Sequence, residues 1–169
     1  MRPRTTLLES QLDRVERLIR DQSVEHAFAF TADGKLLLHK TDDAISRVAF
    51  MDAEIALLPG ATLTHNHPGG RSISETDVTF AMDVELAEIR VVTTKRRFIL
   101  LPPAEGWSRL VRHALPAVLK IERHLLQRQV FREIDSGVTS HQEADLTFHH
   151  LLWQRMSRRG LVRYRAEPW

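Results

Sequence analysis

The segment HNHPGGRSISETD, residues 65–77, decides both the fold and the chemistry that we expect of this chain. It continues the short apolar run ATLTH and therefore begins at the end of a buried strand. Alternate side chains of a strand point the same way, so His65 and His67 converge on one point. A proline and two glycines then turn the chain, and Ser74 begins a helix whose first turn carries Asp77. Two imidazoles and one carboxylate thus meet where a strand, a loop and a helix join.

Two histidines and one carboxylate form a common ligand set of zinc sites that leave the fourth position open to water. Zinc lowers the pKa of such a water to about 7, which supplies hydroxide near neutral pH. The chain has no cysteine, so any metal has to be held by histidine and carboxylate side chains. We therefore predict that His65, His67 and Asp77 bind Zn²⁺.

The attacking water also needs a proton acceptor that is not itself a metal ligand. Glu25 is the candidate, because it enters the run EHAFAF, which we expect in the same sheet as ATLTH. Glu54 is the alternative, although its expected place on a helix favours a surface role. Ser74 can cap its helix and also donate a hydrogen bond to an oxyanion. Asn66 points away from the flanking histidines and is expected to hold the loop.

The order of these residues resembles that of the JAMM (MPN) zinc metallopeptidases, which include deubiquitinating enzymes and bacterial relatives. The matching pattern is a glutamate, then His-x-His-Pro, then Ser-x-x-Asp, which here is Glu25, His65, His67, Pro68, Ser74 and Asp77. The resemblance covers about residues 23–107, and the sequence HNHPGG is most similar to that of the bacterial RadC-like and phage-associated branches. It implies a cytidine-deaminase-like fold.

The same resemblance implies a role for each matching residue. Glu25 would be the general base, His65, His67 and Asp77 the zinc ligands, and Ser74 the donor to the oxyanion. The family places six residues between the proline and the serine, whereas this chain has five. The shorter loop leaves the Ser-x-x-Asp spacing intact, but it is expected to change the entrance of the site and thereby the choice of substrate.

The rest of the pattern predicts an α+β fold, a mixed sheet flanked by helices with a helical C-terminal extension. Helices are expected at residues 6–22, 48–58 and 74–89, and strands at 61–65, 90–94 and 96–101. A hairpin is expected over residues 25–40, turning at Asp33-Gly34. Beyond residue 103 we expect only helices, at 106–133 with a kink or break at Pro116, and at 140–160.

We expect residues 1–103 to form the JAMM-like core with its N-terminal helix, and residues 104–169 to pack on that core or on a dimer partner. The extension has apolar faces that need covering, formed by Leu110, Leu115, Leu119, Leu146, Leu152 and Trp153. Trp107 and Trp153 are expected in the core, and Trp169 is expected to be loosely held.

Charge and composition bear on location and partners. Residues 1–89 carry 9 Lys/Arg and 15 Asp/Glu, whereas residues 90–169 carry 15 and 7. The basic half is interleaved with acids, which favours a solvated surface over nucleic-acid binding. The N-terminal residues resemble neither a signal nor a transit peptide, and no apolar run is long enough to span a membrane. We therefore expect a cytoplasmic protein.

The function expected is hydrolysis of a peptide or isopeptide bond, in deconjugation or processing at the C-terminal tail of a ubiquitin-like protein. Two alternatives remain open. One is a RadC-like, metal-containing module that binds nucleic acid or protein, and the other is a processing domain associated with a phage or toxin.

Overall fold

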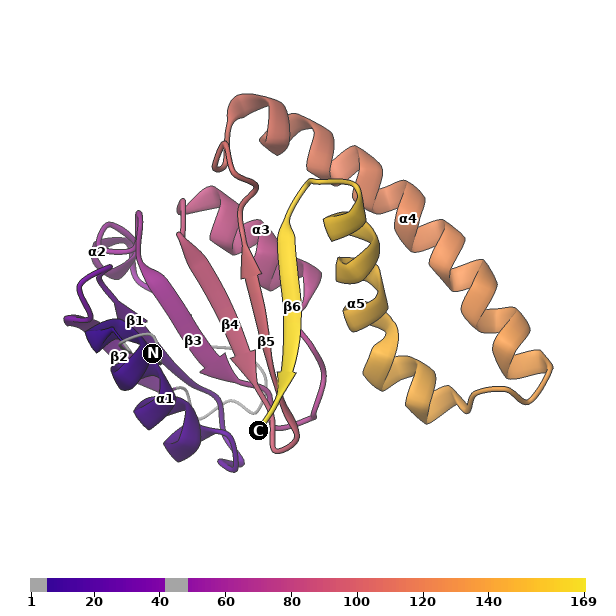
Figure 1. Ribbon diagram of the computed structural model, residues 1–169, viewed down its shortest axis with the longest axis horizontal. Coiled ribbons are helices and arrows are strands. Elements are labelled where there is room, and N and C mark those ends of the chain that lie inside the picture. Colours follow the sequence, from indigo (N-terminus) through magenta and orange to yellow (C-terminus); the bar gives the residue numbers. More distant parts are fainter. Residues whose placement is uncertain (1–5, 42–48) are drawn as a thin grey trace, which may run out of the picture.

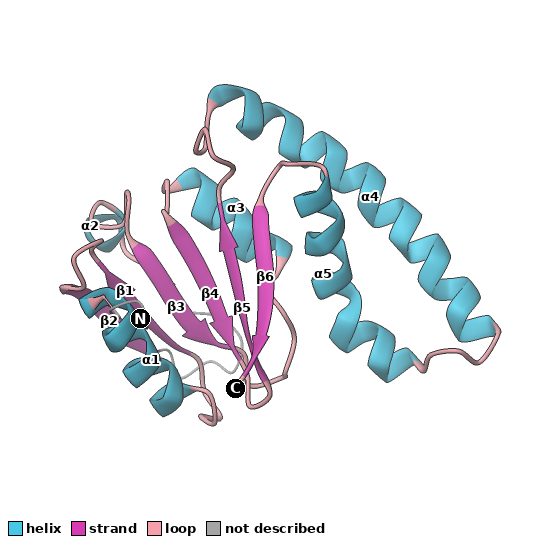
Figure 2. Ribbon diagram, in the orientation of Figure 1, coloured by secondary structure: helices cyan, strands magenta, loops and turns pink. Residues whose placement is uncertain are grey.

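The structure, a computed structural model, describes residues 6–41 and 49–169. It is built on a six-stranded mixed sheet in the order β2-β1-β3-β4-β5-β6, with helices on both faces (Figures 1 and 2). The strands are β1 (His26–Phe30), β2 (Leu36–Thr41), β3 (Thr62–Asn66), β4 (Glu88–Val92), β5 (Arg96–Leu101) and β6 (Arg163–Pro168). The helices are α1 (Leu7–Ile19), α2 (Asp52–Ile55), α3 (Glu75–Asp83), α4 (Arg109–Asp135) and α5 (His141–Arg158). The coarse prediction of a mixed sheet flanked by helices is confirmed.

The sheet combines crossover connections with hairpins. β1 pairs antiparallel with β2, and Gly34 makes the turn between them with a φ of 86°, as the Asp-Gly signal predicts. β3 and β4 pair in parallel, with α3 as the crossover between them. Because the loop that leaves β3 leads directly into α3, the end of β3 and the start of α3 lie at the same edge of the sheet.

Several expected boundaries are wrong. The helix beginning at Ser74 ends at Asp83 rather than near Ile89, because Glu85 adopts a left-handed φ of 58° and residues 88–92 pair with β3 instead. The helix expected over 48–58 is only the single turn Asp52–Ile55, and its expected start at Val48 lies outside the described residues. α4 continues through Pro116 without a break.

The prediction that only helices follow residue 103 is also wrong. Residues 163–168 form β6, which pairs antiparallel with β5 along its whole length and extends the central sheet. Trp169 is not loose: its indole N–H donates to the carbonyl of Thr93 at 2.7 Å, and the guanidinium of Arg97 lies 4.4 Å from its ring. The C-terminal residues are therefore part of the same sheet as the N-terminal strands.

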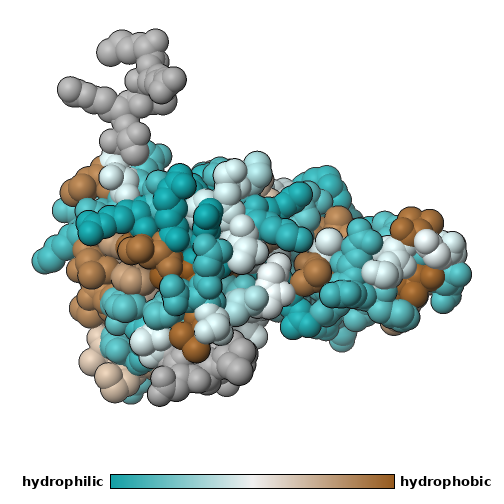
Figure 3. Space-filling view, turned by 90° about the horizontal axis from the view of Figure 1, so that it is seen from below, coloured by the Kyte–Doolittle hydropathy of each residue, from teal (hydrophilic) through white to brown (hydrophobic). Residues whose placement is uncertain are grey.

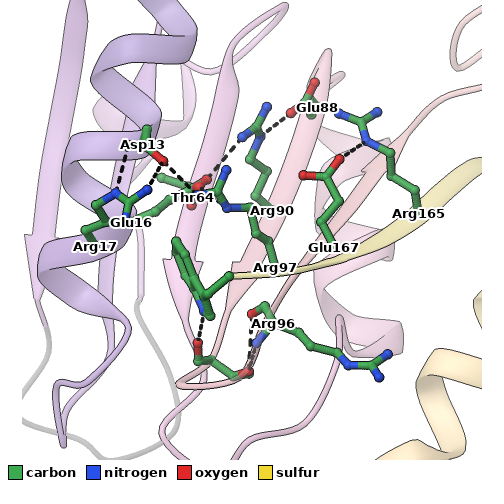
Figure 4. Close-up of polar contacts among 12 residues, drawn as sticks. Asp13, Glu16, Arg17, Thr64, Glu88, Arg90, Arg96, Arg97, Arg165 and Glu167 are labelled. Carbon is green, nitrogen blue, oxygen red and sulfur yellow. Dashed lines mark hydrogen bonds and ion pairs between the residues drawn. The ribbon is translucent and has the colours of Figure 1, made fainter.

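α1 covers one face of the sheet through a buried charged network (Figure 4). Glu16 is completely buried and accepts hydrogen bonds from Thr64 Oγ1 at 3.2 Å and Arg90 Nη1 at 3.3 Å. Arg97 Nε lies 3.2 Å from the other oxygen of Glu16, close enough for an ion pair but without hydrogen-bond geometry. These contacts tie α1 to three strands of the sheet.

The opposite face carries the main core, to which α3, α4 and α5 contribute. Of the apolar residues expected to be covered, Leu115, Leu119, Leu152 and Trp153 are buried, whereas Leu110 and Leu146 are exposed. The far ends of α4 and α5 project from the body as an arm (Figure 3). No helix among the described residues is both long and apolar enough to cross a membrane.

Candidate metal centre

Strand pairing brings Glu25 to the histidines. In the antiparallel ladder of β1 and β3, Ala27 is the partner of His65. Glu25 precedes Ala27 by two residues and His67 follows His65 by two, so the carboxylate lies beside the two imidazoles. Asp77 reaches the same point from the first turn of α3. The structure thus brings together all four of these predicted residues, from segments far apart in the sequence.

The distances among these side chains are those of ligands around one ion. The Nε2 atoms of His65 and His67 are 3.0 Å apart. Asp77 Oδ1 lies 3.4 Å from the first and Asp77 Oδ2 lies 3.6 Å from the second. Glu25 Oε1 lies 3.7 Å and 3.5 Å from the same two nitrogens. Two ligands about 2.05 Å from a tetrahedral zinc ion would be about 3.3 Å apart, which is close to the separations of each carboxylate from the two imidazole nitrogens.

Glu25, His65 and His67 form a compact group that could hold a metal ion, with ligand atoms within 4.8 Å of one another. The predicted ligand set has Asp77 in place of Glu25. Asp77 remains a candidate because it approaches both Nε2 atoms, while its Oδ2 also accepts hydrogen bonds from the backbone N–H and the hydroxyl of Ser74, each at 2.7 Å. The capping contact orients this carboxylate toward the histidines.

The outer contacts of the two imidazoles differ. His67 Nδ1 lies 3.2 Å from the carbonyl oxygen of Arg71, and a carbonyl only accepts, so Nδ1 carries the proton and Nε2 presents its lone pair to the cluster. Among the described residues, His65 Nδ1 and Glu25 Oε2 are buried without a hydrogen-bond partner. Buried polar atoms without partners are rare in folded proteins, and a bound water or ion is one explanation for them.

The electrostatics separate the two carboxylates. Burial raises the pKa of Glu25, and the charge of His65 offsets only part of this rise. Burial also acts to raise the pKa of Asp77, but His65, His67 and the Ser74 hydroxyl together hold it well below its usual range. Asp77 is thus kept ionised, as a ligand must be, whereas Glu25 is disposed to accept a proton.

The two histidines also differ in charge. Burial lowers the pKa of His65, but the carboxylates of Asp77 and Glu25 outweigh this effect and raise it above its usual value. The pKa of His67 is lowered to about 4, first by burial and then by the charge of His65. In the metal-free cluster, His65 therefore takes up a proton more readily than an ordinary histidine, and His67 takes one up less readily.

The cluster lines a pocket of about 870 Å³. The loop after β3 and the start of α3 supply polar lining residues, among them Ser74. Apolar residues also line the pocket, and the rings of Phe50 and Phe80 stack there with centroids 5.3 Å apart. His149 of α5 also lines the pocket, which no local pattern indicated because only the packing of α5 brings it there.

The structure also distinguishes the remaining candidates. Glu54 accepts hydrogen bonds from Lys40 Nζ at 2.6 Å and from the Met51 N–H at 2.7 Å, and it is not among the residues lining the described pocket. Ser74 caps α3, with its hydroxyl accepting from the Asp77 N–H at 3.1 Å. Asn66 faces away from the histidines, as expected, but its side chain bonds residues 22–26 around the start of β1 and not the loop that follows β3.

No protein-family model matches this chain, and no curated protein or solved structure matches it either.

Proposed function

We propose that this protein is a zinc-dependent hydrolase of the JAMM (MPN) type that cuts a peptide or isopeptide bond. The observation that carries the proposal is the meeting of two imidazoles and two carboxylates in one pocket, with the imidazole nitrogens 3.0–3.7 Å from each other and from the carboxylate oxygens. Catalytic zinc sites keep one position accessible to water and substrate, whereas structural sites are closed by four protein ligands. Access from a pocket favours the catalytic type.

Each side chain has a chemical role in this proposal. His65, His67 and Asp77 hold the ion, which when bound would act as a Lewis acid and lower the pKa of water. Glu25 accepts a proton from the attacking water and passes it to the leaving amine. Ser74 donates to the oxyanion once its hydroxyl turns from Asp77, to which it now donates.

The pocket bears on the class of substrate. The stacked rings of Phe50 and Phe80 offer an apolar surface in the same pocket as the polar cluster. A peptide with an apolar side chain near the cut bond would bury that side chain there, and the C-terminal tail of a ubiquitin-like protein remains the proposed natural substrate. The loop between Pro68 and Ser74, one residue shorter than in the family, contributes residues to the lining of the same pocket.

The RadC-like alternative, a module that binds nucleic acid, has less support. Several arginines of the basic C-terminal half are paired within the molecule instead of being free for phosphates. Arg112 binds Glu85 at 2.7 Å, Arg123 binds Glu75 at 3.2 Å, and Arg159 binds Glu122 at 2.7 Å. Two of these pairs join the basic half to the acidic N-terminal half.

Metal analysis and hydrolysis assays on the purified protein test the proposal. We expect about one zinc per chain, chelator-sensitive cleavage of a panel of fluorogenic peptides and ubiquitin-like substrates, and loss of most of the zinc in His67→Ala. His124→Ala is the matched control, because His124 is exposed on α4. Stoichiometric zinc in His67→Ala would overturn the ligand assignment, and a zinc-loaded protein that cuts no substrate of the panel would overturn the enzymatic proposal.

A further inference from the structure

Side chains of the C-terminal part of the chain form hydrogen bonds to the loop that follows the two histidines. Trp153 of α5 donates its indole N–H to the carbonyl oxygen of Ile73 at 2.7 Å, across 80 positions of sequence. Both side chains are completely buried. A buried hydrogen bond to a loop carbonyl restricts the position of the backbone, because a buried carbonyl without a partner is unfavourable.

A second contact holds the neighbouring residue. The hydroxyl of Tyr164, on β6, lies 2.9 Å from Ser72 Oγ and 2.8 Å from His150 Nδ1. Ser72 is 1% exposed, so its contact with Tyr164 is shielded from water. Arg71 and Asp145 form a further ion pair between loop and α5, but both side chains are more than half exposed, and exposed pairs contribute little.

These contacts lie next to the Arg71 carbonyl, which orients the proposed ligand His67. The carbonyl of Arg71 accepts the Nδ1–H of His67, and the next two residues, Ser72 and Ile73, are the ones held from α5 and β6. On the other side, the loop contains Gly70 with a left-handed φ of 77°. Glycine allows many backbone conformations, so the loop depends on outside contacts to keep the Arg71 carbonyl in place.

We propose that Trp153 and Tyr164 are positioning residues of the metal centre, which hold residues 71–73 so that the Arg71 carbonyl orients the imidazole of His67. The inference rests on the proposed metal binding, and it makes the C-terminal helix and strand a functional part of the site. Partners that orient a ligand in this way typically change metal affinity by about 10–100-fold when removed.

The main test compares two tryptophan variants. Trp153→Phe removes the bond to Ile73 and keeps an aromatic ring. Trp107→Phe is the matched control, because the indole of Trp107 is also buried and donates to a backbone carbonyl, that of Leu86, at 2.9 Å. The readouts are the zinc dissociation constant, from competition with a chromophoric chelator, and the visible absorption spectrum of the cobalt-loaded protein, which reports ligand geometry. Chemical denaturation measures the stability of each variant.

We expect Trp153→Phe to weaken zinc binding by about tenfold or more and to change the cobalt spectrum, while Trp107→Phe preserves both even where it lowers stability. Equal zinc affinities and cobalt spectra in the two variants would overturn the inference. A wild-type protein that binds neither metal would instead overturn the proposed function, and this inference with it.

A second set of variants keeps the test valid if Trp153→Phe does not fold. Tyr164→Phe and Ser72→Ala each remove one side of the same contact, and the double variant removes both. If the contact positions the loop, each single change weakens zinc binding and the double change weakens it by less than the product of the two effects. Wild-type affinity in Tyr164→Phe, or independent effects of the two changes, would overturn the role of Tyr164.

Discussion

Asn66 accepts the backbone N–H of His26 on its Oδ1 atom at 2.7 Å, from the face of β3 opposite to the metal cluster. Its Nδ2 atom donates to the carbonyls of Gln22 and Val24 at 3.3 and 3.0 Å. The three bonds lie on both sides of Glu25 in the sequence. The segment His65–His67 thus supplies two imidazoles on one face and, through its middle residue, fixes the carboxylate that lies beside them.

Asn66→Ala should therefore impair hydrolysis more than metal binding. The change leaves three partly buried backbone groups without their partner, which we expect to lower the free energy of unfolding by about 1–3 kcal/mol. It also frees the backbone that carries Glu25, so hydrolysis should fall while zinc stoichiometry is kept. Denaturant titration, metal analysis and the hydrolysis assay measure these quantities. Unchanged hydrolysis in a destabilised variant would mean that Glu25 does not depend on Asn66.

Loss of the Glu25 carboxylate should reduce hydrolysis, whereas loss of the Asp77 carboxylate should reduce zinc binding. Glu25→Gln should keep about one zinc per chain and reduce hydrolysis by roughly 100-fold or more, because the proton acceptor is lost. Asp77→Asn should lose most of the zinc, because an ionised ligand is lost. Metal analysis and rate measurements on both variants distinguish the roles. The reverse result for zinc would make Glu25 the ligand, as the compact group of Glu25, His65 and His67 allows.

Local patterns were sufficient to predict most of this site. The alternation of His65 and His67 and the capping position of Asp77 depend only on neighbours within one strand end and one helix turn. Glu25 is different, because its distance in sequence from the histidines is not constrained. Its position follows from the pairing of Ala27 with His65. The pattern of apolar residues indicated that the two strands share a sheet, but it did not give the register of their pairing.

The errors arise where tertiary contacts override local preference. Residues 163–168 are mostly polar and contain a proline, yet they pair with β5 because that strand presents a free edge. The run after Asp83 has an amphipathic appearance, but the left-handed Glu85 ends the helix and parallel pairing with β3 takes over. The entry of His149 into the pocket likewise depends on how α5 packs, and no spacing in the sequence encodes it.

Zinc affinity should decrease as the pH is lowered, and the decrease should correspond to the uptake of one proton. Metal binds the unprotonated imidazoles. In the metal-free protein Asp77 and Glu25 overcome the effect of burial and raise the pKa of His65 above its usual value of 6.5, whereas burial and the charge of His65 lower the pKa of His67 to about 4. As the pH falls from about 6.5 to 5, protons compete for His65 alone, so affinity should drop about tenfold per pH unit.

Competition with a chelator of known proton affinity measures this dependence. Glu25→Gln removes one of the carboxylates that favour protonated His65, so the fall in affinity should begin at a lower pH in that variant. A dependence on two protons across the whole range, or the same curve in the variant, would contradict the charge distribution described for the cluster.

Loss of Glu16 should destabilise the fold without touching the metal site. Glu16 is completely buried on the face of the sheet opposite to the cluster and neutralises Arg90 and Arg97. Removing one partner of a buried charged pair is unfavourable by about 3–5 kcal/mol, so Glu16→Ala should lower the free energy of unfolding by roughly that amount. Zinc affinity of the folded fraction should stay at the wild-type value. A loss below 1 kcal/mol, on the order of an exposed pair, would mean that the network does not hold α1.

Truncation at Pro103 should give an insoluble or markedly destabilised protein. The truncated chain lacks α4, α5 and β6, so β5 becomes an edge strand with exposed backbone groups, and the core loses large buried side chains, among them Trp153. A chain of about a hundred residues also buries a smaller share of its surface than the full chain does.

A shorter truncation after Leu161 separates the contributions of the removed parts. It keeps both helices and removes β6 together with Tyr164, so it should stay partly folded yet bind zinc more weakly than the full chain, because Ser72 loses its partner. Solubility, size-exclusion chromatography and zinc affinity compare the two truncations with the full chain. If the chain ending at Pro103 instead remains folded, monomeric and active, residues 104–169 are a separate arm that binds a partner. In that case the site needs neither the shared core nor the hydrogen bonds from α5 and β6 to residues 72 and 73.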